Sequence, residues 1–288
     1  MAGSLIPVCI GSSFAFAGGS FLLSPFLVTL LGIASLHSAA NLLNDYYDAR
    51  GSDPINMRVT PFSGGSRVIQ DGDVRAGTIL TMAILSLVIT LGTAIWLGYK
   101  GRPLVFPIGL LGLFAGWSYS SPPLQLMSRG WGEILIFFAF GPLISLGAYY
   151  VNTGDLSLPA FLLGFPQGFL ITGVIWINQF PDYHADREAG KMNLVVRSGL
   201  AISRHLYCLI MLLSFVSIIF LTGMKEVSYL ILLAFLSLPL AIRAMGIVRR
   251  EYLNYNALIP AQALTIQTVI AQGLLLSLGL MSGRFVHA

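Results

Sequence analysis

Two stretches of sequence decide how this chain folds, and each places acidic side chains at the end of an apolar run. The first reads Asn41-Leu-Leu-Asn44-Asp45-Tyr-Tyr-Asp48 and closes an apolar span at 21–46. The second reads Asn178-Gln-Phe-Pro-Asp182-Tyr-His-Ala-Asp186 and closes an apolar span at 159–180. A bilayer crossing needs about 20 mostly apolar residues. Each stretch therefore marks the point where a membrane helix emerges into water.

The remainder of the chain is as apolar as these two spans. Hydrophobic residues make up 56% of the 288 residues and charged residues only 10%, against about 25% charged residues in soluble domains. These values exclude an ordinary soluble protein. We expect about nine helices, at 4–17, 21–46, 78–98, 104–120, 133–151, 159–180, 201–222, 228–247 and 260–281. The predicted fold is an all-α, polytopic membrane protein with a single domain over 1–288.

The loops between these helices alternate between a longer and a shorter set. The longer set and the adjoining helix ends hold all of the lysine and arginine residues except Lys100, Arg102, Lys225 and Arg284. By the positive-inside rule the longer loops are cytoplasmic, and so is the N-terminus, which lacks the features of a cleaved signal peptide. We predict a protein of the cell (inner) membrane. The basic residues lie singly rather than on one face, which argues against a nucleic-acid partner despite the net charge of +4.

The two acidic stretches lie four predicted crossings apart, which is an even number, so both reach the same side of the membrane. Their similarity indicates a weak internal tandem repeat, with copies at about 1–132 and 133–288 and a site between them.

The spacing of the polar residues places them on one helix face in each stretch. Asn41, Asp45 and Asp48 follow at i, i+4 and i+7, and Asn178, Asp182 and Asp186 repeat the pattern. Neighbouring carboxylates repel one another, so a cation should offset them. Oxygen ligands without nearby cysteine favour Mg²⁺, which keeps sites for water and phosphate. Solvated loop acids are the alternative interpretation.

These patterns give a set of candidate site residues. The predicted metal ligands are Asp45, Asp48, Asp182, Asp186 and, in the adjoining loop, Asp53. We expect two Mg²⁺ ions to bridge them to a diphosphate that also contacts Asn41, Asn44 and Asn178.

Basic and aromatic residues lie beside the acidic stretches. Arg58 and Arg67 flank Ser63-Gly64-Gly65-Ser66, and Lys191 follows Asp186 by five residues. Such cations bind phosphate and stabilise a leaving diphosphate, so Arg67 and Lys191 are candidate catalytic residues. Tyr119 is a third candidate, with a membrane-interface tyrosine as the alternative. His37, one turn before Asn41, could be a polar pocket wall or a hydrogen-bonded helix contact.

Taken together, the motifs resemble the UbiA superfamily of intramembrane prenyltransferases over nearly the whole chain. The matching elements are Asn41-x-x-Asn44-Asp45-x-x-Asp48-x-x-x-x-Asp53, Asp182-x-x-x-Asp186 with Lys191 after it, and Tyr119-Ser-Ser-Pro-Pro. The first departs from the family pattern, because the third aspartate commonly lies where this chain has Ser52. The resemblance implies helices around a central cavity and Mg²⁺-dependent transfer of a prenyl group from a polyprenyl diphosphate to an aromatic acceptor.

Two further stretches, 140–154 and 186–199, look most like the 1,4-dihydroxy-2-naphthoate prenyltransferases of menaquinone synthesis. This resemblance implies that acceptor, with loss of CO₂ from the attacked carbon. Prenyl transfer to 4-hydroxybenzoate, homogentisate, a glyceryl phosphate or a porphyrin derivative is the alternative. A cation-coupled transporter is a second alternative, for which ionisable groups near the middle of the bilayer would be expected.

Overall fold

The computed structural model describes residues 1–49, 51 and 53–286, and this part of the chain is helical almost throughout. The α-helices are α1 (Ala2–Ala17), α2 (Leu23–Asp48), α3 (Ala76–Tyr99), α4 (Val105–Ser120), α5 (Gly132–Phe138), α6 (Ile144–Thr153), α7 (Leu158–Leu162), α8 (Phe165–Glu188), α9 (Leu194–Ser198), α10 (Leu200–Leu221), α11 (Leu238–Glu251) and α12 (Tyr255–Val286). Short 3₁₀ helices occupy Asp53–Ile55, Leu126–Arg129 and Tyr229–Ser237, and the π-helical turn Ala139–Leu143 joins α5 to α6.

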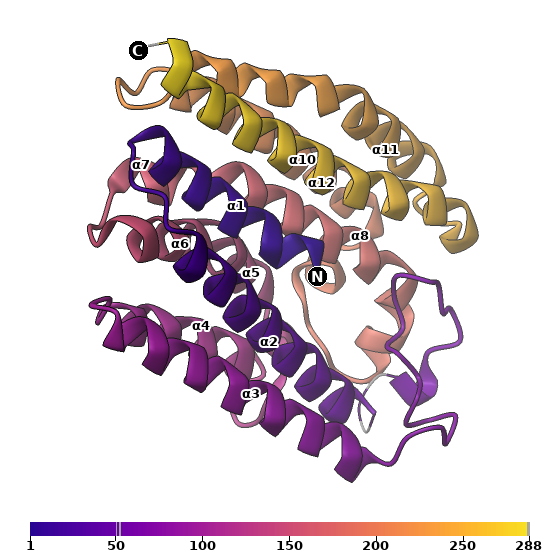
Figure 1. Ribbon diagram of the computed structural model, residues 1–288. Helices are drawn as coiled ribbons and strands as arrows, with labels where there is room; N and C mark the ends of the chain where they lie inside the picture. Colours follow the sequence, from indigo (N-terminus) through magenta and orange to yellow (C-terminus); the bar gives the residue numbers. More distant parts are fainter. Residues whose placement is uncertain (50, 52, 287–288) are drawn as a thin grey trace.

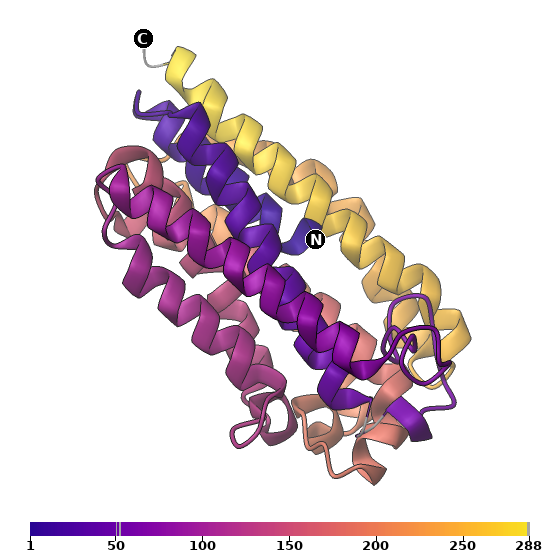
Figure 2. The ribbon, with the colours of Figure 1, turned by 60° about the horizontal axis from the view of Figure 1, so that its bottom comes forward.

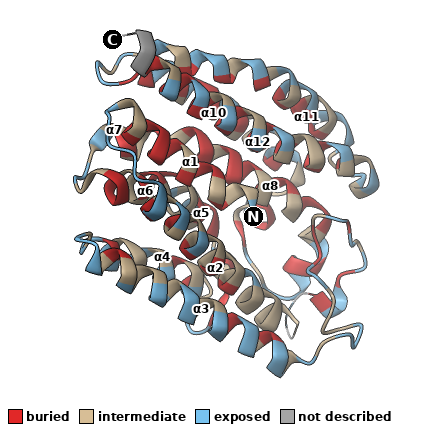
Figure 3. Ribbon diagram, in the orientation of Figure 1, coloured by how far each residue is buried: buried red, intermediate tan, exposed pale blue. Residues whose placement is uncertain are grey.

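The predicted membrane architecture is confirmed. Among the described residues, seven helical segments are long and apolar enough to cross a bilayer, and α1 and α4 are two shorter apolar helices. Figure 3 shows exposed residues along the outward faces of α3 and α11. Many of these are large and apolar, such as Val88 and Ile242, which are 59% and 55% exposed. An exposed apolar surface of this kind is suited to contact with lipid.

One predicted boundary is wrong. We expected the helix that carries the second acidic stretch to end at residue 180, before Pro181, but α8 continues through this proline to Glu188. Proline removes a single main-chain hydrogen bond and clashes locally, and α8 packs against α10 and α12, which offsets this local cost. Asp182 and Asp186 therefore lie on the same helix as Asn178, as their spacing predicts.

The helices form a bundle (Figure 1). Helix α2 packs on α3 and α4, α1 lies between α6 and α12, and α8 contacts α5, α10 and α12. The long loop between α2 and α3 lies near the C-terminal end of α8, as Figures 1 and 2 agree. Both acidic stretches are thus at one end of the bundle. The interpretation of the chain as a tandem repeat stays a prediction.

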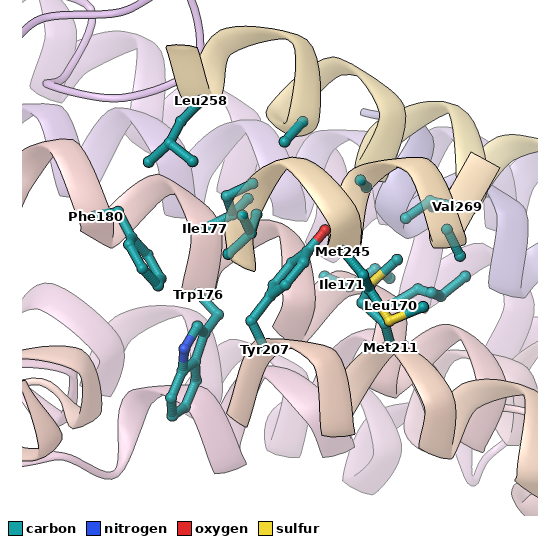
Figure 4. Close-up of a cluster of buried hydrophobic side chains, with 14 of the residues drawn as sticks. Leu170, Ile171, Trp176, Ile177, Phe180, Tyr207, Met211, Met245, Leu258 and Val269 are labelled. Carbon is teal, nitrogen blue, oxygen red and sulfur yellow. The ribbon is translucent and has the colours of Figure 1, made fainter. Parts of the chain in front are cut away.

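An apolar core joins α8 to α10, α11 and α12 (Figure 4). Ile177, Tyr207, Met211 and Leu258 are fully buried in it. The Tyr207 hydroxyl lies 2.6 Å from Thr265 Oγ1, so its polar atom is satisfied within an apolar layer. This core fixes α8, and hence the second acidic stretch, against the C-terminal helices.

Helices α1 and α6 cross at a close contact that only glycine allows. A Cβ atom added at Gly11 would collide with the main-chain oxygen of Ser145. Because this neighbour is backbone, it cannot rotate away, and the two helix axes would have to move apart.

We therefore expect Gly11→Val to lower the stability of the protein by about 1–3 kcal/mol through overpacking. Thermal unfolding in detergent measures this loss. Gly92→Val in α3 is the matched control, because a Cβ atom at Gly92 meets nothing within 4 Å. Equal melting temperatures for the two variants would contradict the close packing of α1 on α6.

Candidate active site

A cavity of about 760 Å³ opens among α1, α2, α4, α6 and α8. It has a polar end and an apolar arm. The polar end is lined by all five aspartates that the sequence predicts as metal ligands, namely Asp45, Asp48, Asp53, Asp182 and Asp186. The predicted diphosphate ligands Asn41, Asn44 and Asn178 line the cavity as well, together with Tyr119 and Lys191. The fold thus brings together groups that lie more than 130 residues apart in sequence.

The first acidic stretch lies in the last two turns of α2. Asn44 Nδ2 donates a hydrogen bond to Asp48 Oδ2 at 3.0 Å, as expected for an i, i+4 pair on one helix face. Asp45 lies one residue after Asn44, and both residues line the cavity. The helix ends at Asp48, so its carboxylates emerge where the chain leaves the bundle.

The second acidic stretch lies on α8 and is held by two asparagines. Asn56 Nδ2 donates to Asp182 Oδ1 at 2.7 Å, and Asn193 Nδ2 donates to Asp186 Oδ2 at 2.8 Å. Hydrogen bonds to a carboxylate stabilise its charged form and fix its orientation. Each aspartate of α8 is therefore positioned by a loop residue from outside its own helix.

Lys191 connects the two stretches. Its Nζ lies 3.0 Å from Asp48 Oδ2 and 3.7 Å from Asp186 Oδ1, and its side chain is only 17% exposed. Burial alone would lower the pKa of Lys191, but the carboxylates of Asp48 and Asp186 outweigh it and raise this pKa above its ordinary value. Lys191 is thus a fixed positive charge between α2 and α8.

A buried glutamate holds the loop that carries Lys191. Glu133 Oε1 accepts hydrogen bonds from Gln179 Nε2 at 2.9 Å and from the Leu194 N–H at 3.0 Å. Asn193 also caps α9 by accepting from the Val196 N–H at 2.8 Å. The segment that follows Lys191 is therefore fixed to Glu133 and to the first turn of α9.

Asp53 is buried under a glycine-rich turn. Gly64 and Gly65 have φ angles of +90° and +74°, and a Cβ atom at Gly65 would collide with the Asp53 carboxylate. Burial, with the nearby charge of Asp48, raises the pKa of Asp53 to about 6. Gln70 Nε2 donates to its carboxylate at 3.2 Å. The turn needs glycine because the loop main chain lies directly on this acid.

Two predicted residues lie away from the cavity wall. Arg67 Nη1 donates to the main-chain oxygens of Asp53 at 3.3 Å and Asn56 at 3.5 Å. Its Nε lies 3.7 Å from the Asp71 carboxylate. The guanidinium of Arg58 lies 5.8 Å from the ring centre of Tyr255. In this structure Arg67 therefore braces the loop after α2, and Arg58 connects that loop to α12.

Sequence reasoning missed Asn56, Asn193 and Glu133 as supports of the site. Asn193 follows Lys191 by two residues and precedes a short helix, so its capping position was a usable signal. No sequence signal indicated a supporting role for Asn56 or Glu133, because their partners on α8 and in the loop after it are far away in sequence. Only the packing of the loop after α2 against α8 brings Asn56 to Asp182.

The residues present fit a magnesium site that needs a phosphate ligand to complete it. Within the described part of the chain, no group of three or more His, Cys, Asp or Glu side chains is arranged to enclose a metal ion. The cavity wall nevertheless carries five carboxylates and a single lysine. Mg²⁺ is usually held by one or two carboxylates, with water and substrate phosphate as the other ligands. This donor set matches that requirement.

The apolar arm runs from the acidic end along α2. Asp45 and Thr29 both line the cavity, and 16 helical residues span roughly 24 Å. Glycines at 32, 109, 112 and 147 line the arm, and Leu97, Val105, Tyr150 and Val151 line its far end. These four residues form a buried apolar cluster. The arm can thus take a long, thin apolar chain attached to an anionic head.

Comparisons with known proteins agree with this geometry. A model of the UbiA prenyltransferase family matches residues 4–277. The chain is 25% identical over 284 residues to 1,4-dihydroxy-2-naphthoate octaprenyltransferase of Bacillus subtilis, with 98% of this chain and 89% of that protein covered. It is 28% identical over 285 residues to the protein of the same name from Escherichia coli, with 96% and 91% covered.

A solved structure shares the fold. The structure of a UbiA homologue from Archaeoglobus fulgidus bound to GPP and Mg²⁺ superposes with a TM-score of 0.62 at 18% identity, over 96% of this chain and 95% of that one. Since the family model covers nearly the whole sequence, this chain belongs to the UbiA prenyltransferase family and is a membrane-embedded prenyltransferase.

Proposed function

We propose that this protein transfers a prenyl group from a polyprenyl diphosphate to an aromatic acceptor, with 1,4-dihydroxy-2-naphthoate as that acceptor and a place in menaquinone synthesis. The observation that carries the proposal is the two-ended cavity, with carboxylates and Lys191 at one end and a long apolar arm at the other. The naphthoate acceptor is supported by the names of the relatives from Bacillus subtilis and Escherichia coli.

In the proposed mechanism, the acidic end binds the diphosphate. Asp45, Asp48, Asp182 and Asp186 would hold two Mg²⁺ ions, with Asp53 beside them and Asn41, Asn44 and Asn178 contacting the diphosphate oxygens. Bound Mg²⁺ supplies Lewis-acid stabilisation of the charge that develops on a leaving diphosphate. A UbiA homologue was solved with GPP and Mg²⁺, which supports this assignment.

Lys191 provides a positive charge from the protein itself, in addition to that of the metal ions. Its ammonium group lies between Asp48 and Asp186 and can donate to a diphosphate oxygen while the bond between C1 and the bridging oxygen breaks. Tyr119, on the same cavity wall, can donate its hydroxyl hydrogen to the diphosphate or the acceptor. We assign Arg67 and Arg58 a supporting role, because their partners lie in the loop after α2 and on α12.

The apolar walls have a chemical function as well as a binding one. The electron-poor prenyl carbon must be captured by an aromatic carbon before water reaches it. In a naphthoate acceptor the attacked carbon carries a carboxylate, so CO₂ leaves after the new C–C bond forms. The distribution of basic residues supports a cytoplasmic location for the acidic end. A transporter is disfavoured, since its ionisable groups would be expected near the middle of the bilayer.

The first test combines several prenyl diphosphates with several aromatic acids and with a glyceryl phosphate, using purified protein. We expect Mg²⁺-dependent release of pyrophosphate and a product whose mass shows prenyl addition with loss of CO₂ for 1,4-dihydroxy-2-naphthoate. A product formed only with 4-hydroxybenzoate, homogentisate or the glyceryl phosphate would contradict the proposed acceptor. Absence of prenyl transfer to every acceptor would contradict the proposal as a whole.

In the same assay, Asp45→Asn and Asp182→Asn should each reduce turnover by about 100-fold or more, because each removes a charge needed to hold the metal and diphosphate. Asp155→Asn, at an exposed position in the loop between α6 and α7, is the matched control and should keep full turnover. Full Mg²⁺-dependent turnover in Asp45→Asn or Asp182→Asn would contradict the assignment of these aspartates as metal ligands.

A third test concerns the apolar arm. Gly109 lines the cavity on α4, and a Cβ atom there meets nothing within 4 Å. Gly109→Leu should therefore fold normally but fill the arm, and lower kcat/KM for long prenyl diphosphates about 10-fold or more relative to geranyl diphosphate. Gly92→Leu on the outer face of α3 should not change this ratio. If Gly109→Leu and the unchanged protein show the same ratio of kcat/KM for long prenyl diphosphates to kcat/KM for geranyl diphosphate, the prenyl chain does not bind in this arm.

A further inference from the structure

One polar side chain on the cavity wall has no role in holding a diphosphate or a metal ion. His37 lies on α2, one turn deeper than Asn41, and its ring lines the cavity. It is about 12 Å along the helix axis from Asp45, at 1.5 Å per residue. It therefore lies deeper than the acidic end, about halfway between Asp45 and Thr29 along α2.

The hydrogen bonds of His37 define which ring nitrogen carries the proton. His37 Nδ1 lies 2.8 Å from Ser4 Oγ, and Ser4 Oγ lies 3.0 Å from the main-chain oxygen of Met1. A serine hydroxyl has a single hydrogen. Both contacts are satisfied together when Ser4 donates to the Met1 oxygen and His37 Nδ1–H donates to Ser4. The lone pair then resides on Nε2.

The surroundings of His37 suit an aromatic ligand. Its ring meets the ring of Phe140 edge to face, with the centroids 5.0 Å apart and the planes at 81°, and Phe140 also lines the cavity. Ser4 is 1% exposed, so the anchor on Nδ1 is protected from water. Within residues 1–49, 51 and 53–286, His37 Nε2 makes no hydrogen bond to another residue, and His37 borders the cavity.

Other ionisable groups on the cavity wall are unsuited to accept a proton from the acceptor. The carboxylates of Asp45, Asp48, Asp53, Asp182 and Asp186 belong to the end that we assign to metal and diphosphate. Lys191 is held as a cation between two of them. A neutral imidazole with a free lone pair, anchored through its second nitrogen, is the usual arrangement of a general base.

We propose that His37 is the catalytic base of the aromatic half-reaction, and that it accepts the hydroxyl proton of a hydroxylated aromatic acceptor on Nε2. This inference rests on the proposed prenyl transfer. It makes the acceptor subsite the part of the cavity between His37 and Phe140, and it specifies the class of acceptor as a phenol or naphthol.

The proton and electron balance of this step needs no further reactant. The C1–O bond breaks and its electron pair leaves with the diphosphate, while a π pair of the acceptor forms the new C–C bond. The acceptor O–H becomes a ring ketone and its proton moves to His37 Nε2. When the attacked carbon carries a carboxylate, CO₂ then leaves, its bonding pair restores the aromatic ring, and the oxygen takes the proton back from His37.

The test uses variants that keep the anchor to Ser4 but remove the base. In His37→Asn the side-chain amide can still donate to Ser4 Oγ, whereas no atom replaces Nε2. We expect single-turnover prenyl transfer to fall about 10²–10⁴-fold. The Kd for a prenyl thiodiphosphate in the presence of Mg²⁺ should stay within about twofold of the starting protein. His205→Asn, on an exposed surface of α10, is the matched control and should keep its rate.

Two further measurements separate a base from a structural residue. Imidazole added to His37→Ala should restore the rate in proportion to its concentration. An acceptor whose hydroxyl is made more acidic by ring fluorination should show a smaller deficit in His37→Asn than the parent acceptor does. A rate that stays within a few-fold in His37→Asn, or a deficit that neither imidazole nor fluorination reduces, would overturn the proposal.

The outcomes also distinguish this inference from the proposed function. If the starting protein transfers no prenyl group to any aromatic acceptor, the proposed function fails and His37 has no proton to accept. If the starting protein forms product and His37→Asn forms it equally fast, only the role of His37 is contradicted.

Discussion

Repulsion among carboxylates gathered at one end of the cavity is the constraint on which the rest of the site depends. Five aspartates line one end of a membrane-embedded cavity, and Lys191 is the single lysine among them. Removing an ion from water costs several kcal/mol, whereas one favourable pair at 4 Å near a protein surface returns about 4 kcal/mol. One lysine cannot offset five such charges. The site therefore needs more positive charge, which divalent cations would supply.

The same constraint explains why so much of the molecule supports this end. Asn56 and Asn193 each hold one aspartate of α8, and Glu133 fixes the loop that carries Lys191. Hydrogen-bond donors from loops position the carboxylates without burying further unpaired charges. The apolar core between α8 and α12 then keeps the helix itself in place (Figure 4). A rigid bundle thus holds the carboxylates of the polar end in defined positions.

Much of the fold could be predicted from the sequence, because long apolar spans between charged loops specify membrane helices directly. The helical spacing of Asn41, Asp45 and Asp48 also predicted a shared face. What the sequence could not predict were contacts made by packing between distant segments, such as Asn56 on Asp182. For the same reason the sequence did not predict the contacts of Arg67 with the main-chain oxygens of Asp53 and Asn56, and its role at the diphosphate stays a prediction.

The most direct test of the central claim is the location of divalent metal in the cavity. Crystals of the protein with a prenyl thiodiphosphate and Mn²⁺ in place of Mg²⁺ allow the metal to be located by anomalous scattering. Our account predicts metal density between the α2 pair, Asp45 and Asp48, and the α8 pair, Asp182 and Asp186, with the diphosphate beside it and the prenyl chain in the apolar arm. Metal density elsewhere, or a diphosphate bound away from these aspartates, would contradict it.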